Sequence, residues 1–246
     1  MTDYRVTDDQ GDALREHTRA VLDSEPNVVP DVAIGLERLC RAAALELSLD
    51  QVSVTLITDG GSSVLVASSV QPGLGIEELQ FDLGEGPTQD TYAARRPILV
   101  PDLRDSQGRW PGFAAAAIER DVLSVFAFPL QLGAVRFGVL TGVRAAAGAL
   151  GPQELTACLI FAEVATELLL DSSPTGAHPD PDLHGAIHTR DVVYQAQGMV
   201  MVELGVSLEV ALARMRATAF ADGVSLQQLA ADIVAGRRPF RLGDVP

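Results

Sequence analysis

The spacing of apolar residues along the chain changes between two periods, and each period predicts a different kind of element. Between residues 31 and 47, apolar side chains recur every three or four positions, which is the period of one helix face. Between residues 51 and 58 they alternate with polar ones, which is typical of a strand. The helix positions are Val32, Leu36, Leu39, Ala43 and Leu47, and the strand positions are Val52, Val54 and Leu56.

The remainder of the first 171 residues continues this mixture of strands and helices. Asp59-Gly60-Gly61 predicts a turn into a second strand at 63–69. Residues 71–96 have a looser pattern, with helical turns expected only over 88–94. The further elements expected are a short helix at 12–24, a strand at 97–103, a loop and short helix at 108–124, a hairpin at 123–144 and a helix at 151–171. This order predicts an α+β domain, with one antiparallel sheet and helices on its faces.

The strand pattern ends at residues 172–186, which contain three prolines and two glycines and are expected to form a linker. Three helices are expected after it. The first spans about 187–204 and ends at Gly205, the second begins at the N-cap Ser207, and the third begins at a capping box formed by Ser225 and Gln228. The side chains expected to face inward are Val193, Ala196, Val200, Leu204, Leu208, Ala211, Leu212, Met215, Ala219, Leu226, Leu229, Ala230 and Ile233.

These patterns divide the chain into five parts. They are an N-terminal extension (1–26), the α+β domain (27–171), the linker (172–186), an all-α three-helix unit (187–238) and a C-terminal tail (239–246). A bundle of about 50 residues is only marginally stable alone. We therefore expect the three-helix unit to associate with a partner, and a homodimer is the simplest arrangement.

Composition removes several kinds of chemistry. All 18 basic residues are arginine, so a Schiff-base lysine and a phosphate-binding loop ending in GK[ST] are excluded. Cys40 and Cys158 lie far apart without metal-binding spacing, and they are expected to be buried thiols in a reducing cytosol. Three of the four histidines fall in or next to the linker, where we expect solvated side chains. No apolar run reaches the ~18 residues of a membrane span. We expect a cytoplasmic protein without a catalytic site, metal site or membrane contact.

The charge of the chain is strongly negative and unevenly distributed. The formal net charge is −15 at pH 7, which disfavours attraction of the whole protein to phosphate backbones. Residues 187–246 contain six arginines and six acidic residues, so the first 186 residues carry the whole excess. Any binding of nucleic acid must therefore be local to the nearly neutral C-terminal part.

The three-helix unit resembles an ANTAR domain, the small RNA-binding module of transcription antiterminators. The resemblance covers residues 187–238 and includes the stretch YQAQGMVMVELGVSLEVALARMRATAFADGVSLQQLAADIV. It rests on residues in all three helices: Ala196, Gly198, Met201, the LGVS motif at 204–207, Ala211, Arg216, Ala219, Leu229, Ala230 and Val234. Many family members carry a lysine where this chain has Gln197.

The α+β domain resembles a GAF domain, a sensory fold. The matching stretch runs from LGEGPTQDTYAARRPILVPDL through GRWPGF to VFAFPLQLGAVRFGVL. The pairing implies a bacterial regulator in which the sensor controls whether an output dimer binds paired stem-loops in nascent RNA, so that a terminator fails to form. We expect no cofactor, and the resemblance leaves open whether an unidentified small molecule fills the GAF-like domain.

Recognition of RNA loops uses arginine on phosphates, together with amide and aromatic groups on splayed bases. The candidate residues are Arg190, Tyr194, Gln195, Gln197, Gly198, Arg214, Arg216, Arg237 and Arg238. Some of them have an alternative interpretation that involves only structure. Arg216 is also placed to pair with Asp232, Tyr194 to lie in the core, and Arg237 and Arg238 to form a solvated tail. Gly198, which weakens its helix, allows close approach either of another helix or of RNA.

Two hypotheses about function follow. The first is signal-dependent antitermination through RNA binding, without catalysis, in which the acidic domain screens the helical unit from RNA or serves only solubility. The alternative is a protein-interaction or dimerisation module without RNA binding, which the near-neutral charge of residues 187–246 and Gln197 favour. A redox activity of the two cysteines has no motif to support it.

Overall fold

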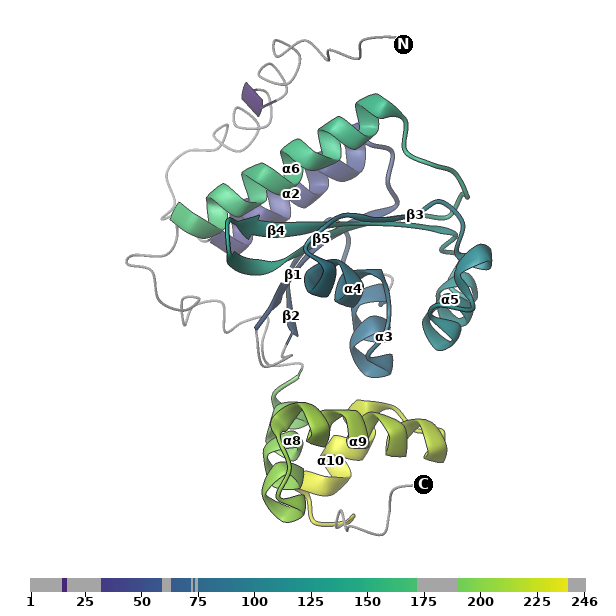
Figure 1. Ribbon diagram of the computed structural model, residues 1–246, viewed down its shortest axis with the longest axis vertical. Helices are drawn as coiled ribbons and strands as arrows, with labels where there is room; N and C mark the ends of the chain where they lie inside the picture. Colours follow the sequence, from purple (N-terminus) through teal and green to yellow (C-terminus); the bar gives the residue numbers. More distant parts are fainter. Residues whose placement is uncertain are drawn as a thin grey trace.

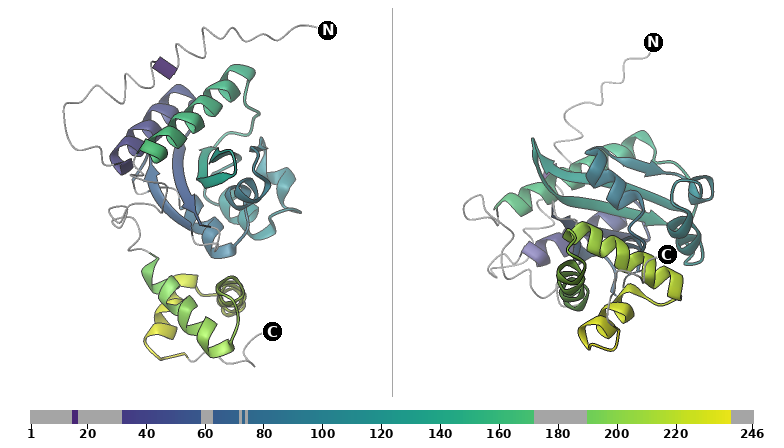
Figure 2. Two further views of the ribbon diagram at one scale, coloured as in Figure 1. Left: turned by 60° about the vertical axis from the view of Figure 1, so that its left-hand side comes forward. Right: turned by 60° about the horizontal axis from the view of Figure 1, so that its bottom comes forward.

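The computed structural model describes residues 15–16, 32–58, 63–71, 73, 75–171 and 190–238. They form an α+β domain and, below it in Figure 1, a three-helix unit. The expected linker at 172–186 lies outside the described residues, as do most of the expected N-terminal helix at 12–24 and the turn at 59–61. The two parts are also seen from two other directions in Figure 2.

The α+β domain is built on one five-stranded sheet with the order β2-β1-β5-β4-β3, in which all neighbouring strands are antiparallel. The strands are β1 (Gln51–Ile57), β2 (Ser63–Ser68), β3 (Ile98–Val100), β4 (Ser124–Leu132) and β5 (Val135–Arg144). Helices α2 (Val32–Glu46) and α6 (Pro152–Asp171) lie on one face, and α3 (Ile76–Leu83) and α4 (Pro87–Ala94) lie on the other (Figure 1). A 3₁₀ turn, η1 (Leu103–Ser106), and α5 (Pro111–Ile118) follow β3. The predicted fold class is confirmed.

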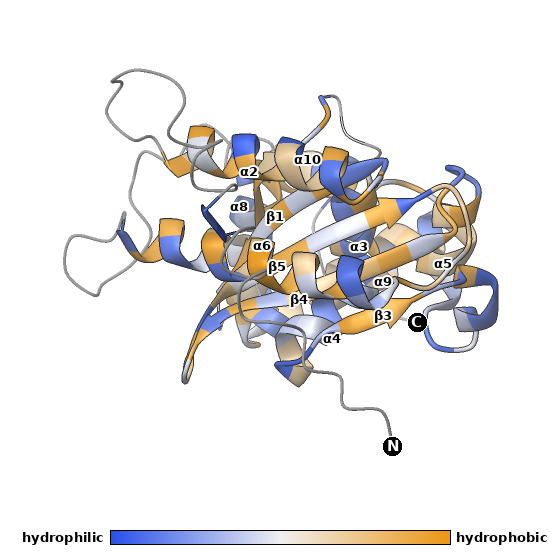
Figure 3. Cartoon of the chain, turned by 90° about the horizontal axis from the view of Figure 1, so that it is seen from above, coloured by the Kyte–Doolittle hydropathy of each residue, from blue (hydrophilic) through white to orange (hydrophobic). Residues whose placement is uncertain are grey.

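The two faces of the sheet bury different kinds of side chain. Under α2 and α6 the expected alternation places Val52 and Val54 against Leu36, Leu39 and other apolar residues of one large core cluster. In Figure 3 apolar and polar residues follow one another along the strands. On the opposite face the intervening side chains of β1 are Gln51, Ser53 and Thr55, and all of them are buried. The alternation along β1 therefore separates an apolar layer from a polar one.

Helix α3 is an element that the sequence pattern did not predict. It lies inside residues 71–96, which were expected to be mostly irregular. Its sequence, IEELQFDL, buries Ile76 and Phe81 but also the polar Glu77 and Gln80. Because two of the four buried positions are polar, the helix has no continuous apolar stripe, and its period is hidden.

The three-helix unit consists of α8 (Asp191–Leu204), α9 (Leu208–Asp222) and α10 (Leu226–Val234). Two predicted caps are confirmed, because Ser207 accepts a hydrogen bond from the Val210 amide and Ser225 from the Gln228 amide. Gly205 ends α8 in the left-handed conformation. The expected core residues are buried with one exception. Leu208 is 45% exposed, because it is the first residue of α9 and lies next to the cap.

Candidate nucleic-acid interface

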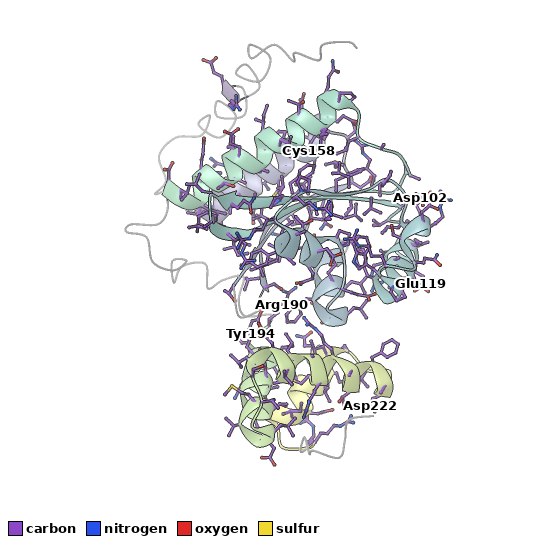
Figure 4. All side chains as sticks on the ribbon, in the orientation of Figure 1. Asp102, Glu119, Cys158, Arg190, Tyr194 and Asp222 are labelled. Carbon is purple, nitrogen blue, oxygen red and sulfur yellow. The ribbon has the colours of Figure 1, made fainter. Side chains whose placement is uncertain are left out.

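The nine candidate RNA-binding residues fall into two groups. Arg190, Tyr194 and Arg216 face the α+β domain, and they contact residues of β2 and α3. The other six lie inside the three-helix unit or on its remaining surface. Figure 4 shows Arg190 and Tyr194 at the junction between the two parts of the protein.

Arg190, just before α8, is almost completely buried, with 8% of its surface exposed. Its Nη1 donates to the backbone oxygen of Ser63 at 2.6 Å and to the Ser63 hydroxyl at 3.0 Å. Its Nη2 donates to the backbone oxygen of Glu77 at 3.4 Å. The guanidinium carbon lies 4.0 Å from the centre of the Phe81 ring, which is a cation–π contact. Arg190 thus connects α8 to both β2 and α3.

Tyr194, one turn further along α8, contacts the same two elements. Its hydroxyl donates to the Ser63 backbone oxygen at 2.7 Å and accepts from the Ser63 amide at 3.0 Å. Its ring meets Phe81 edge to face, with the ring centres 6.1 Å apart. Burial raises the pKa of the Tyr194 hydroxyl above its ordinary value. The side chain therefore packs between two domains rather than within a single core.

Arg216, in α9, completes the contact. Its Nε donates to the Phe81 backbone oxygen at 2.8 Å, and its guanidinium lies 5.2 Å from the Phe81 ring centre. Burial lowers the pKa of Arg216 to about 10, which leaves it charged at neutral pH. The alternative pairing of Arg216 with Asp232 is wrong, because Asp232 pairs with Arg237.

Phe81 is the centre of this contact, and sequence reasoning did not single it out. It belongs to α3 of the α+β domain, yet its buried side chain is part of the apolar cluster of the three-helix unit. It contacts all three of the candidate residues described above. The only sequence signal is an apolar residue within a segment of loose pattern, and this signal does not reveal a partner from another domain.

Gln197 and Gly198 occupy different environments although they are neighbours. Gln197 is 3% exposed, and its side-chain amide donates to the Leu208 backbone oxygen at 2.8 Å. This residue therefore ties α8 to the start of α9, and RNA cannot reach it in this structure. At Gly198, apart from its chain neighbours and the backbone of its own helix, no described atom lies within 4 Å of the place that a Cβ would occupy. Packing between helices of this chain therefore does not explain the glycine.

The remaining candidates are accessible. Gln195 is exposed, and Arg214 is half-exposed without an ion pair to any residue that the structure describes. Arg237 and Arg238 are not a free cationic tail, because Arg237 pairs with Asp232 and Arg238 with Asp222. Ion pairs at an exposed surface contribute only about 0–1 kcal/mol, so a phosphate can displace the carboxylates.

A polar layer lies between α3, α4 and the sheet. The Glu77 carboxylate accepts hydrogen bonds from the Ser53 hydroxyl and, at 3.1 Å, from the Gln51 amide. Gln80 bonds Thr88, whose hydroxyl lies 3.0 Å from that of Thr141. The buried hydroxyls of Thr55 and Thr91 have no hydrogen-bond partner among the described residues. The interior of the α+β domain is therefore polar where α3 and α4 meet β1, although apolar clusters around Ile76 and Val139 lie on the same side of the sheet.

Glu77 predicts a pH dependence of stability. Burial raises its pKa above the ordinary value of 4.5, against the lowering effects of the Ser53 hydrogen bond and the Arg190 charge. A group with a raised folded pKa stabilises the fold below its unfolded pKa, and this stability is lost as pH rises through the folded pKa. We expect Glu77→Gln to increase the free energy of unfolding at pH 8 and to change it little at pH 4, measured by urea denaturation.

The control is Glu78→Gln, which removes an exposed carboxylate from the same helix. It should leave the difference between pH 4 and pH 8 as in the wild type. An equal change in both variants would contradict the assignment to burial of Glu77.

The described residues contain no metal-binding cluster, and both of their cysteines are buried. No group of three or more histidine, cysteine, aspartate or glutamate residues is arranged to hold a metal ion in the part of the chain that is described. Both cysteines are buried, and burial raises the pKa of Cys158 to about 12 and that of Cys40 further. Among the described helices none alone has the length and hydropathy of a membrane span, although the pair α8 and α9, bent by 105°, meets these criteria together.

Two protein families match different parts of the chain. A GAF domain family matches residues 31–169, and an ANTAR domain family matches residues 182–234. Both are regulatory and non-catalytic families. No curated protein matches the sequence.

Solved structures of GAF domains resemble the α+β domain. The GAF domain of a phosphoenolpyruvate-protein phosphotransferase from Coxiella burnetii has a TM-score of 0.52 and 17% identity, over 66% of this chain and 94% of that one. A phycocyanobilin-bound GAF domain from a cyanobacterial phytochrome has a TM-score of 0.51 and 12% identity, over 68% of this chain and 98% of that one. At these identities the likeness establishes the fold and nothing more.

Proposed function

Because the chain belongs to the GAF domain family and carries an ANTAR domain, we propose that it is a non-catalytic regulator that binds paired stem-loops in nascent RNA. In this proposal the ANTAR domain binds the RNA as a homodimer and promotes antitermination, and the GAF domain receives the signal. The observation that carries the proposal is the ANTAR match, which spans all three helices of the unit. The accessible groups that support it are Gln195, Arg214, Arg237 and Arg238.

We propose that a signal molecule acts at the polar layer of the GAF domain. The hydroxyls of Thr55 and Thr91 are buried without partners, and a buried polar group without a hydrogen bond is costly. A small molecule with hydrogen-bonding groups would satisfy them. The layer reaches α3, which contacts the ANTAR domain through Phe81.

The test is binding of the full chain to RNA with two adjacent hairpins, titrated across salt concentrations. The variant Arg214→Ala/Arg237→Ala/Arg238→Ala should bind about tenfold or more weakly, and the slope of log affinity against log salt should fall by about 0.7 for each lost phosphate contact. The control Arg41→Ala/Arg96→Ala/Arg120→Ala removes the same charge from the GAF domain. Equal losses in both triple variants would contradict the assigned surface.

The second candidate is a protein-interaction module that does not bind RNA. It is favoured by a groove of about 680 Å³ on the ANTAR domain, lined mainly by Gly198, Met199, Val202 and Ile233. Val202 is 75% exposed and Met199 is 43% exposed, so the groove presents large apolar side chains next to each other, as interaction sites do. If the full chain binds paired hairpins no better than a single-loop control at low salt, this candidate replaces the first.

A further inference from the structure

Helix α3 is the element that faces both domains. Its side chains Glu77 and Gln80 bond residues of the polar layer of the GAF domain, and Phe81 enters the apolar cluster of the ANTAR domain. The backbone oxygens of Glu77 and Phe81 accept hydrogen bonds from Arg190 and Arg216. Any displacement of α3 therefore changes both the interior of the sensor and its contact with the ANTAR domain.

We propose that the GAF domain and RNA compete for one surface of the ANTAR domain, made by Arg190, Tyr194 and Arg216, and that α3 occupies this surface when RNA is absent. The inference rests on the proposed function. The surface made by Arg190, Tyr194 and Arg216 does not include the accessible arginines tested above. The competition and the RNA binding can therefore be tested with different variants.

The groups of Arg190 and Tyr194 that could bind RNA already have partners in the GAF domain. Both Nη atoms of Arg190 already donate to Ser63 or Glu77, and its planar face is covered by Phe81. The Tyr194 hydroxyl is bonded to Ser63, and its ring packs against that of Phe81 in a T-shaped arrangement. A base that stacks on an arginine or tyrosine, or a phosphate that bonds an arginine, needs the same groups. RNA and α3 therefore cannot hold this surface at the same time.

The present acceptors of Arg190 and Arg216 are neutral. Arg190 is buried and Arg216 is partly buried, and they donate to backbone oxygens and to the Ser63 hydroxyl. The carboxylates of Glu77 and Asp82 act on these two arginines only through their charge, and neither arginine forms an ion pair in the described parts of the chain. Hydrogen bonds from arginine to an anionic oxygen are roughly twice as strong as bonds between neutral groups. A phosphate is thus a better partner for these guanidinium groups than the backbone of α3, and the contact can be exchanged.

The C-terminal end of α3 lies against Arg216. Gly84 ends the helix with φ of 70°, and a Cβ there would lie 2.9 Å from Nη1 and 3.1 Å from Cδ and Cζ of Arg216. Gly75 precedes the helix with φ of 69°, and a Cβ there would meet no described atom within 4 Å. Alanine at either position suffers the same backbone strain, but only Gly84→Ala displaces Arg216. The two variants are a matched pair.

The experiment uses the full chain with Gly84→Ala, its control Gly75→Ala, and Phe81→Leu, which retains an apolar side chain but removes the aromatic ring under Arg190. Small-angle X-ray scattering gives the radius of gyration without RNA, and titration gives affinity for paired-hairpin RNA. We expect Gly84→Ala and Phe81→Leu to have a larger radius of gyration and to bind RNA about 2- to 10-fold more tightly. This is the shift expected when one hydrogen bond (Gly84→Ala) or one cation–π contact (Phe81→Leu) of the closed state is lost. Gly75→Ala should match the wild type in both measurements.

Two results would overturn the competition. The first is an expanded Gly84→Ala or Phe81→Leu protein with unchanged RNA affinity, because the surface would then be free without being used. The second is a Gly75→Ala protein that changes as much as Gly84→Ala, because strain alone would explain the effect. If no protein, wild type included, binds RNA while the two variants expand, the proposed function fails although the contact between the domains is real.

Discussion

Replacement of Phe81 by alanine is expected to detach the ANTAR domain from the GAF domain and to lower the free energy of unfolding by about 3–5 kcal/mol. The side chain is 2% exposed and packs in the apolar cluster of the ANTAR domain, so its removal leaves a cavity between the two domains. It also removes the ring that covers Arg190. Urea denaturation followed by far-ultraviolet circular dichroism measures the loss.

Phe220→Ala is the matched control, because Phe220 is 77% exposed and its truncation should change stability by no more than about 0.5 kcal/mol. Trp110 is the only tryptophan and is buried in the GAF domain, so its fluorescence follows that domain alone. A Phe81→Ala protein with the stability of Phe220→Ala would contradict the assigned role of Phe81.

Replacement of Met215 by alanine should unfold the ANTAR domain and abolish RNA binding while the GAF domain remains folded. Met215 is fully buried in α9, and loss of a buried methionine side chain costs about 2–5 kcal/mol. A bundle of about 50 residues has little stability to lose. The expected result is a decrease in helical circular dichroism with the unfolding transition of Trp110 fluorescence unchanged.

Met199→Ala is the control for Met215, because this methionine lies on the exposed face of α8. Its helical signal should match that of the wild type. Loss of the Trp110 transition in Met215→Ala would show that the two domains unfold as one unit although Trp110 and Met215 lie in different apolar clusters, and it would contradict this prediction.

The sequence predicted most of the fold because most elements have a clear period. The alternation in β1, the spacing in α2 and the serine caps of α9 and α10 all appear in the structure. Helix α3 did not follow this rule, because its buried face carries Glu77 and Gln80 for the polar layer. The spacing of apolar residues does not reveal a helix when polar side chains make up half of its buried face.

The candidate site was less predictable for a related reason. Residue type identified Arg190, Tyr194 and Arg216 as able to bind RNA, but it did not indicate what they contact when RNA is absent. Their partners, Ser63 and Phe81, lie more than 100 residues away in the sequence. Contacts between domains leave no periodic signal, so only the structure reveals them.

At Gly198 the sequence and the structure both indicate that space is kept open beside α8. The sequence indicates that α8 tolerates a residue that weakens it so that something can come close. The structure leaves the space above Gly198 open, in a groove that Arg238 also lines. The glycine therefore keeps room for a partner outside the described chain, and the RNA titration of the full chain shows whether that partner is RNA.

The most direct test of the competition between α3 and RNA is hydrogen–deuterium exchange of the full-length protein with and without paired-hairpin RNA. If RNA takes Arg190, Tyr194 and Arg216 from the GAF domain, amides of residues 76–83 and 63–68 should exchange faster when RNA is bound, although these residues do not touch RNA. Amides at the start of α8 should exchange more slowly. If RNA binds but exchange in residues 76–83 stays unchanged or becomes slower, α3 is not displaced by RNA and the proposed competition is contradicted.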